Sequence, residues 1–384
     1  MGMGAGALIS ISTFLKPLIS DFGWLRGETS FAYMAGAIAM GVGGIVMGYL
    51  SDRYSTRPVI IVGTLCLGGS LLLLATQSSL WQFYLYYCLM GGFGSAALDA
   101  PLLANVGNWF DRNKGLALGL ALAGRALGQG GIPFASGVLI SAIGWRDAYT
   151  VLGIVCVVAM LPMVFLIRDP PGLAEAKEAS RRISKTELRA AYPVPPTLAV
   201  AWLSGAGLFC CICMGTAMVH AVVIAEDAGI GAKEAAGVIL LIYVSGFFGR
   251  IAFGKLSDHI GSIRAYWLAS FGQTVLIFWF TQLQSVSGFY AHAVIFGFFM
   301  SGVMTGLIVC VRELTPAHMR GISNGIVVLL AWIGMGLGGY QGGLFFDLSG
   351  AYEISYANAA AAGVVNLVVV GSLYSFVRRK TVSP

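Results

Sequence analysis

Three ionisable side chains lie inside long apolar stretches of the sequence: Asp99, Arg125 and Arg250. A charge at the centre of a bilayer costs at least about 2.5 kcal/mol, so such a residue usually faces a bundle interior and has a function. Arg250 follows Tyr243 by seven residues, which places both on one face of a helix. Because a guanidinium can bind a carboxylate through two parallel hydrogen bonds, Arg250 is a candidate anchor for an organic anion. The alternative is a structural arginine that pairs with acidic loop residues.

Asp99 and Arg125 are expected to form a pair. Asp99 precedes Phe110 by eleven residues, and Arg125 follows Asn113 by twelve. At about 1.5 Å per residue, both then lie roughly 17 Å from one edge of the membrane, on consecutive antiparallel helices. The pair could be a permanent structural contact. It could also be a proton-linked switch, because burial favours the neutral acid while the guanidinium favours the carboxylate. An anion bound at Arg125 would then shift Asp99 towards protonation.

Other polar and aromatic side chains are candidates for proton transfer or substrate contact. His220 could relay a proton, although a neutral histidine that joins two helices by a hydrogen bond is the commoner arrangement. Tyr243 and Trp332 are the preferred substrate contacts, and each candidate has an alternative role in packing or interhelical hydrogen bonding. The candidates for the lining of a substrate site are Asn105, Gln129, Tyr243, Trp332, Tyr340 and Gln341.

The composition indicates the elements that must hold these residues. Charged residues make up 10% of the 384 residues, apolar residues 57%, and the mean hydropathy is +0.82. A soluble domain is about a quarter charged, which excludes a water-soluble enzyme. The apolar stretches are too long and continuous for β-barrel strands and favour helices. Twelve transmembrane helices are predicted at 1–20, 29–50, 57–76, 80–108, 114–141, 147–167, 197–224, 234–255, 265–284, 287–311, 319–345 and 354–377.

The polar segment 169–196 divides this pattern into an N-terminal six-helix bundle, 1–168, and a C-terminal six-helix bundle, 197–384. If this connector and both termini are cytoplasmic, 17 of the 23 basic residues lie inside and four lie outside, while Arg125 and Arg250 lie within spans. Such a bias follows the positive-inside rule. We therefore expect a multi-pass protein of the plasma (inner) membrane, with a connector that could hold a short surface helix.

The two bundles are expected to be copies of one unit. The string Gly-x-Leu-Ser-Asp occurs at Gly48–Asp52 and again at Gly254–Asp258, an offset of 206 residues. Parallel repeats of this kind are related by an axis along the membrane normal. The offset also predicts that roughly eight residues are absent from the start of the first helix, so that either this start is truncated or the first helix is short. At this offset the positions equivalent to Arg250, Asp99 and Arg125 are occupied by Gly44, Thr305 and Ala331. The charges within spans are therefore not repeated, as expected for residues that bind an asymmetric substrate.

These strings resemble the signature of the major facilitator superfamily between its second and third helices, and the copy between the eighth and ninth. The resemblance covers nearly the whole chain, and Ser55 departs from the family pattern, which has glycine there. Within the superfamily the chain is similar to the monocarboxylate-porter and oxalate/formate-antiporter branch. The residues that carry this likeness are Phe14–Pro17, Phe22–Trp24, Pro101, Asn108–Arg112, Gly115–Gly124, Gly144–Arg146 and Phe346–Tyr352.

The resemblance implies twelve helices, a central cavity and a rocking motion of the two halves. Arg250 precedes Gly254 by four residues, which matches the substrate-anchoring arginine of monocarboxylate transporters. Carboxylates near a helix N-terminus gain about 0.3–1 kcal/mol, and the resemblance implies that such loop contacts hold one face closed. The implied gating groups are Asp52, Arg53, Arg57 and Asp258.

Several other chemistries find little support in the sequence. It contains no phosphate-binding loop, zinc-protease motif or nucleotide fingerprint, so we expect no cofactor, no metal and no ATP-driven step. The string from Gly321 to Gly325 spells the nucleophile elbow of hydrolases, but it starts an apolar helix, whereas that motif needs a strand, a turn and a helix. The seven cysteines all lie in apolar stretches and are interpreted as small apolar residues rather than disulfides.

We therefore expect an all-α membrane protein that acts as a secondary active transporter of small organic anions, monocarboxylate-like and proton-coupled, by alternating access. Its partners are the anion, a proton and the lipid bilayer; no nucleic acid is expected, and the chain is expected to be a monomer. One alternative is an efflux carrier for apolar or cationic compounds, although two arginines against one aspartate within spans disfavour a cation carrier. Another is an intramembrane enzyme that uses Ser323.

Overall fold

The computed structural model describes residues 1–109, 114–168, 194–316 and 319–382. The structure is 91% helical, with no strand in these ranges, and its helical segments make twelve passes. Among the described residues, ten passes are helical stretches long and apolar enough to cross a membrane. The predicted twelve-helix membrane fold is therefore confirmed. The connector, where a surface helix was expected, lies mostly outside the described residues.

The first six passes are built from nine helical segments. Two of the passes are composite: α1 and α2 are separated only by Ser10, and the six-residue π-helix η1 joins α5 to α6. The segments are α1 (Gly2–Ile9), α2 (Ile11–Phe22), α3 (Arg26–Tyr54), α4 (Thr56–Thr76), α5 (Leu80–Leu89), η1 (Met90–Ser95), α6 (Ala96–Trp109), α7 (Lys114–Ile143) and α8 (Trp145–Val164).

The last six passes are built from seven segments, and the 3-10 helix η2 extends α12. These segments are α10 (Pro196–Asp227), α11 (Ala232–Ile260), α12 (Ser262–Ile277), η2 (Phe278–Gln282), α13 (Val286–Leu314), α14 (Arg320–Ser349) and α15 (Glu353–Val382). All seven cysteines are free. Five of them are buried, which fits the expectation that they act as small apolar side chains.

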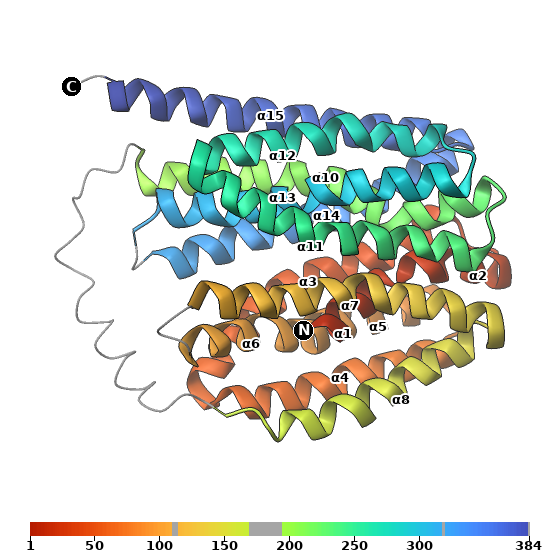
Figure 1. The fold of residues 1–384 in the computed structure, drawn as a ribbon. Coiled ribbons are helices and arrows are strands. Elements are labelled where there is room, and N and C mark those ends of the chain that lie inside the picture. Colours follow the sequence, from red (N-terminus) through yellow and green to blue (C-terminus); the bar gives the residue numbers. More distant parts are fainter. Residues whose placement is uncertain (110–113, 169–193, 317–318, 383–384) are drawn as a thin grey trace.

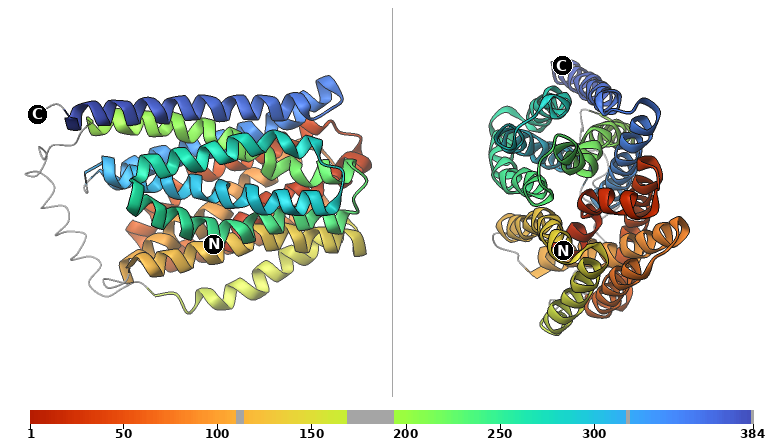
Figure 2. Two further views of the ribbon diagram at one scale, coloured as in Figure 1. Left: turned by 45° about the horizontal axis from the view of Figure 1, so that its top comes forward. Right: turned by 90° about the vertical axis from the view of Figure 1, so that its right-hand side faces the viewer.

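The helices run roughly parallel to one another and form two groups (Figure 1). Segments α1 to α8, here called the N-terminal half, lie on one side, and α10 to α15, the C-terminal half, lie on the other (Figure 2). The end of the bundle where α8 ends and α10 begins is called the connector end, and the C-terminus lies at that end too. The opposite end, where α2 and α10 end, is called the far end.

The halves meet mainly through α3 against α14 and α7 against α11. At the far end and at mid-height these helices touch closely: a methyl group added to Gly336 of α14 would lie 3.0 Å from Met34 of α3, and one added to Gly130 of α7 would lie 3.0 Å from Tyr243 of α11. Nearer the connector end, methyl groups added at Gly48 or Gly325 would meet no atom within 4 Å. The described contacts therefore hold the halves together from mid-height to the far end.

The turns between α3 and α4 and between α11 and α12 show the internal repeat at the level of the backbone. Gly261 has φ +88° and ψ 150°, and Ser55, its counterpart at the offset of 206 residues, has φ +108° and ψ 152°. Ser55 is the one described residue other than glycine with a positive φ. A side chain in this region of φ/ψ space is strained. The turn between α3 and α4 therefore has the same backbone conformation as the turn between α11 and α12, although it has serine where the second turn has glycine.

The π-helix η1 lies directly before the pair-forming part of α6. It contains three glycines, and a methyl group on Gly91 would clash with the backbone of Gly36 in α3. Glycine here lets two backbones approach more closely than any side chain would allow. Because a π-helix shifts the register of the residues that follow it, η1 sets the direction in which Asp99, in the first turn of α6, faces α7.

Candidate functional site

Asp99 and Arg125 form the ion pair expected from the sequence. Arg125 Nη1 of α7 lies 3.1 Å from Asp99 Oδ2 of α6, and each side chain is 18% exposed. The pair does not use all of its polar atoms. Asp99 Oδ1 and Arg125 Nε are buried, and neither has a hydrogen-bond partner among the described residues. A buried polar atom without a partner typically costs about 1–3 kcal/mol, so this pair is able to accept a further polar ligand.

Arg250 of α11 lies at the contact between the two halves. Its Nη1 donates a hydrogen bond of 2.9 Å to the backbone carbonyl oxygen of Leu122 in α7. Its guanidinium is also close enough to that of Arg125 for the two positive charges to repel each other. In the described parts of the chain Arg250 pairs with no carboxylate, so the alternative in which it pairs with loop acids is not what the structure shows.

Tyr243 and Gln129 join this group from two helices. Tyr243 is 3% exposed and interacts with the charges of both Arg250 and Arg125. Gln129 lies one helical turn after Arg125, on the same face of α7, and its Oε1 is buried without a described partner. Both residues were candidates from the sequence, and the structure brings them next to the arginines. We call Asp99, Arg125, Gln129, Tyr243 and Arg250 the central group.

Tyr33 belongs beside the central group, although sequence reasoning did not identify it. It is fully buried in α3, and its hydroxyl interacts electrostatically with that of Tyr243. The Tyr33 hydroxyl has no hydrogen-bond partner among the described residues. Nothing in the sequence distinguishes Tyr33 from the other tyrosines in apolar stretches. Only the packing of α3 against α14, together with the interaction of the Tyr33 hydroxyl with Tyr243 of α11, reveals that its polar end reaches the middle of the protein.

Trp332 and Tyr340 lie in α14, on the side that faces α3. Trp332 is 9% exposed and is next to Gly41, while the ring of Tyr340 meets that of Phe31 edge to face at 5.5 Å. These aromatic side chains therefore contribute to packing between the halves. Their role as substrate contacts stays a prediction.

Asn105 makes the interhelical hydrogen bonds that were considered as its alternative role, and Gln341 makes one as well. Asn105 Nδ2 donates to Thr56 Oγ1 and to the backbone carbonyl of Arg168. Gln341 Nε2 donates to Thr216 Oγ1 at 2.7 Å. Both amides thus join elements within one half.

His220 lies towards the far end of α10 and is completely buried. Its Nδ1 lies 3.0 Å from Tyr352 Oη, and its Nε2 lies 2.7 Å from the backbone carbonyl oxygen of Gly339. Both ring nitrogens are therefore engaged, as in the commoner structural arrangement of a buried histidine. Its contacts do not include the pair of Asp99 and Arg125, so His220 belongs to a different part of the molecule from the central group.

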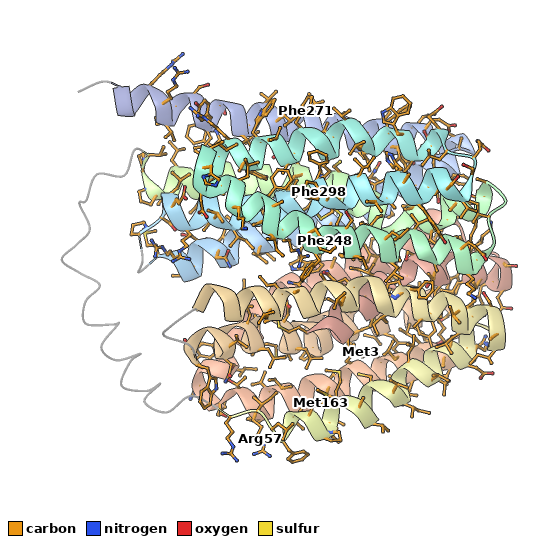
Figure 3. The ribbon with its side chains drawn as sticks, viewed as in Figure 1. Met3, Arg57, Met163, Phe248, Phe271 and Phe298 are labelled. Carbon is orange, nitrogen blue, oxygen red and sulfur yellow. The ribbon has the colours of Figure 1, made fainter. Side chains whose placement is uncertain are left out.

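The proposed gating residues lie at the connector end. Arg53 contacts Tyr49 and Tyr54 of its own helix, and Arg57 lies over the ring of Phe165 at 4.9 Å. Figure 3 shows Arg57 on the outside of the N-terminal half. Asp258 is exposed, and the side chain of Asp52 lies outside the described part of the structure. The contacts described for both arginines stay within one half, so the gating role of these residues remains a prediction.

Comparison with known proteins agrees with the twelve-helix membrane fold, because the matching family and relatives are membrane transporters. The family described as Major Facilitator Superfamily matches residues 1–339. The uncharacterized MFS-type transporter YcxA of Bacillus subtilis (strain 168) is 27% identical over 370 residues, which cover 91% of this chain and 86% of that one. Monocarboxylate transporter 11 of Homo sapiens is 28% identical over 379 residues, which cover 92% of this chain and 76% of that one. The aspyridones efflux protein apdF of Emericella nidulans is 24% identical over 319 residues, which cover 83% and 60%.

Solved structures share the fold. A bacterial homolog of the human lysosomal transporter Spinster superposes with a TM-score of 0.74 at 15% identity, covering 99% of this chain and 94% of that one. The xylose transporter XylE from E. coli superposes with a TM-score of 0.72 at 14% identity, covering 96% and 92%. At these identities the likeness is one of architecture.

Proposed function

The chain belongs to the major facilitator superfamily and is a transporter rather than an enzyme, and we propose that it carries small organic anions by alternating access. The observation that carries this proposal is the charge of the central group. The guanidinium of Arg125 pairs with the carboxylate of Asp99, whereas that of Arg250, which lies close to Arg125, has no carboxylate partner among the described residues. Positive charge is therefore in excess among the described residues at mid-height, and the Met1 amino group, which interacts with both Asp99 and Arg125, adds to it. A buried charge of this kind is stabilised by a counter-ion, and an anionic substrate supplies one.

Arg250 is the proposed dock for the carboxylate. Its hydrogen bond to the Leu122 carbonyl uses one nitrogen of a group that carries five N–H donors. A carboxylate can therefore bind the remaining donors, or replace the carbonyl, because a charged acceptor makes a stronger bond than a neutral one. Since Leu122 belongs to α7 and Arg250 to α11, binding of the substrate changes a contact between the two halves. This is the kind of coupling that alternating access requires.

Asp99 is the proposed proton-binding residue. Its carboxylate is held by Arg125 through one oxygen, while the other oxygen lacks a described partner. An anion bound to Arg125 compensates part of its positive charge, so Arg125 stabilises the carboxylate of Asp99 less strongly. Protonation of Asp99 then becomes more favourable. Uptake of an anion would thereby be linked to uptake of a proton. This makes symport of an acid anion with a proton the proposed reaction.

For orientation we propose that the connector end, where the C-terminus lies, faces the cytoplasm and that the membrane is the plasma (inner) membrane. The N-terminus, also expected on that side, lies within the bundle beside Asp99 and Arg125 in this structure. The proposed orientation rests on the 17 basic residues assigned to the cytoplasmic side against four on the other. The structure then corresponds to a form closed at the outer face, because its described contacts between the halves extend from mid-height to the far end.

A carrier that exports apolar compounds is the second candidate, since relatives of this chain include a protein named for aspyridones efflux. A thermal-shift screen of the purified protein against carboxylates, neutral compounds and organic cations, at two pH values, separates the candidates. The anion proposal predicts stabilisation by carboxylates, and stronger stabilisation at the lower pH. Stabilisation by neutral compounds or cations alone would overturn it. Uptake of a labelled carboxylate into proteoliposomes with an acidic exterior then tests the proton coupling.

A further inference from the structure

At the far end of the bundle, ionic contacts connect the N-terminal half to the C-terminal half. These contacts involve no residue of the central group. Asp227, the last residue of α10, binds two cations of the N-terminal half through separate oxygens. Lys16 Nζ of α2 lies 3.0 Å from its Oδ1, and Arg26 Nη1 of α3 lies 2.6 Å from its Oδ2. Glu226, beside it, lies 4.0 Å from Lys16. Asp227 is thus the centre of this contact.

A second acid, Asp347 of α14, binds the start of α3. Its Oδ1 accepts a hydrogen bond of 3.0 Å from the backbone N–H of Arg26, and its Oδ2 accepts one of 2.6 Å from the backbone N–H of Gly27. The first N–H groups of a helix have no partner within the helix, and this end of the helix carries a partial positive charge. Here a side chain of one half caps a helix of the other half.

The Arg26 guanidinium is enclosed by the C-terminal half. It lies 3.7 Å from the centroid of the Phe346 ring, and its Nη1 also donates to Tyr352 Oη at 3.0 Å. The same Tyr352 hydroxyl contacts His220, whose other nitrogen contacts the carbonyl of Gly339 in α14. His220 therefore fixes the position of Tyr352, and Tyr352 helps to fix Arg26. The Arg26 side chain is only 16% exposed as a result.

The charges in this contact are sorted by half. The cations Lys16 and Arg26 and the start of α3 belong to the N-terminal half, whereas Glu226, Asp227 and Asp347 belong to the C-terminal half. We infer that Lys16, Arg26, Asp227 and Asp347 form a latch that keeps the far end closed, and that Asp227 is its central residue. Because each of these contacts joins a group of one half to a group of the other, opening the far end breaks them and exposes the charges to water. The latch thereby stabilises the closed form relative to the open one.

The same end offers a matched control. Asp21 of α2 contacts Arg146 of α8 at 3.7 Å and accepts a hydrogen bond of 3.2 Å from Trp145 Nε1. These three residues all lie in the N-terminal half. The pair of Asp21 and Arg146 is therefore an ion pair at the far end that does not connect the halves. Neutralising Asp21 removes a carboxylate from that end without touching the latch.

The test measures access to a buried position behind the latch. Ser30 is fully buried one turn below Arg26, facing Gly343 of α14. A Ser30→Cys reporter in full-length protein in nanodiscs is treated with a membrane-impermeant maleimide, and labelling of the same chain without the reporter is subtracted. Asp227→Asn is expected to accelerate labelling roughly tenfold, and Asp21→Asn is expected to leave the rate unchanged. The exchange Arg26→Asp with Asp227→Arg is expected to restore slow labelling.

The inference goes beyond the proposed function, because the readout needs no substrate and its failure would leave the anion proposal intact. Equal labelling of Asp227→Asn and the parent would overturn the latch. So would an equal acceleration by Asp21→Asn, since the effect would then be general loosening. If Asp227→Asn does not fold, Lys16→Gln removes one partner of Asp227 and is expected to give a smaller acceleration in the same assay. No acceleration with Lys16→Gln would likewise overturn the latch.

Discussion

Arg250 of α11 is joined to Leu122 of α7 by a hydrogen bond of 2.9 Å between the guanidinium and a backbone carbonyl. Leu122 precedes Arg125 by three residues, and its contact with Arg250 connects the two halves beside the pair of Asp99 and Arg125. A carbonyl oxygen is a neutral acceptor, and any carboxylate that reaches the same guanidinium competes with it on favourable terms. One side chain thus offers both an attachment for substrate and a contact between the halves.

Replacing Arg250 by lysine tests this dual role. Arg250→Lys keeps the positive charge but loses the planar pair of donors that can bind both oxygens of a carboxylate. We expect carboxylate affinity, measured by equilibrium binding or by thermal shift, to fall by roughly 10- to 100-fold, or about 1.4–2.8 kcal/mol.

Arg264→Lys is the control for this substitution. Arg264 is exposed at the connector end and donates to Tyr374 Oη within the C-terminal half. Its replacement is expected to leave carboxylate affinity unchanged. Unaltered carboxylate binding by Arg250→Lys would rule out Arg250 as the dock.

Asp99→Asn separates the two interpretations of the ion pair with Arg125. As the proton site, Asp99 is needed for accumulation driven by a pH gradient, but not for exchange of labelled against unlabelled substrate. We expect Asp99→Asn to abolish the first in proteoliposomes and to retain the second. Leaving Arg125 without its partner also lowers the free energy of unfolding by up to about 3 kcal/mol.

The double variant Asp99→Asn with Arg125→Gln removes both charges, so it is expected to regain most of the lost thermal stability without regaining accumulation. A purely structural pair would behave differently. Full pH-driven accumulation by the single variant Asp99→Asn would show that protons are carried by another group.

Much of the fold and part of the site could be predicted from the sequence for one physical reason. Membrane-spanning helices need about 20 apolar residues, so their limits are visible as changes in hydropathy. A charge within such a stretch is rare enough to mark Asp99, Arg125 and Arg250 individually. The heights of Asp99 and Arg125 then follow from counting residues along two consecutive helices, and the structure confirms their pairing at 3.1 Å.

The rest depends on contacts between parts of the chain that are far apart in sequence. Arg26 and Asp347 are separated by more than 300 residues. Both lie near helix ends, where charged residues are common and so do not indicate a function. Only the packing of α3 against α14 brings them together. Tyr33 was missed for a related reason, because the sequence of an apolar helix does not show which residues surround the hydroxyl of a tyrosine in it. Sequence reasoning therefore identified the central group better than the latch.

The Tyr33 hydroxyl is expected to matter for substrate and not for stability. It is buried without a described partner, so Tyr33→Phe removes a polar atom whose burial is unfavourable. We expect the melting temperature to stay constant or rise slightly while the KM for transport increases several-fold. Tyr87→Phe is the matched control, because Tyr87 is equally buried but its hydroxyl contacts that of Tyr149 at 3.3 Å.

The control should show the opposite pattern. Tyr87→Phe loses a hydrogen bond and is expected to lower the free energy of unfolding by about 1 kcal/mol with KM unchanged. If Tyr33→Phe destabilised the protein as much as Tyr87→Phe and left KM at its original value, the Tyr33 hydroxyl would be a structural group.

Ser55 supplies a prediction about stability that is independent of substrate. It adopts φ +108°, close to the +88° of Gly261 at the equivalent turn, and a residue with a Cβ atom is strained there. Ser55→Gly is expected to raise the free energy of unfolding by about 1 kcal/mol, because the strain that is relieved exceeds the extra chain entropy of glycine in the unfolded state. Gly261→Ser is the reciprocal change and is expected to lower it by a similar amount. Thermal unfolding in detergent measures both, and a loss of stability on Ser55→Gly would show that the serine side chain contributes more to this turn than its backbone strain costs.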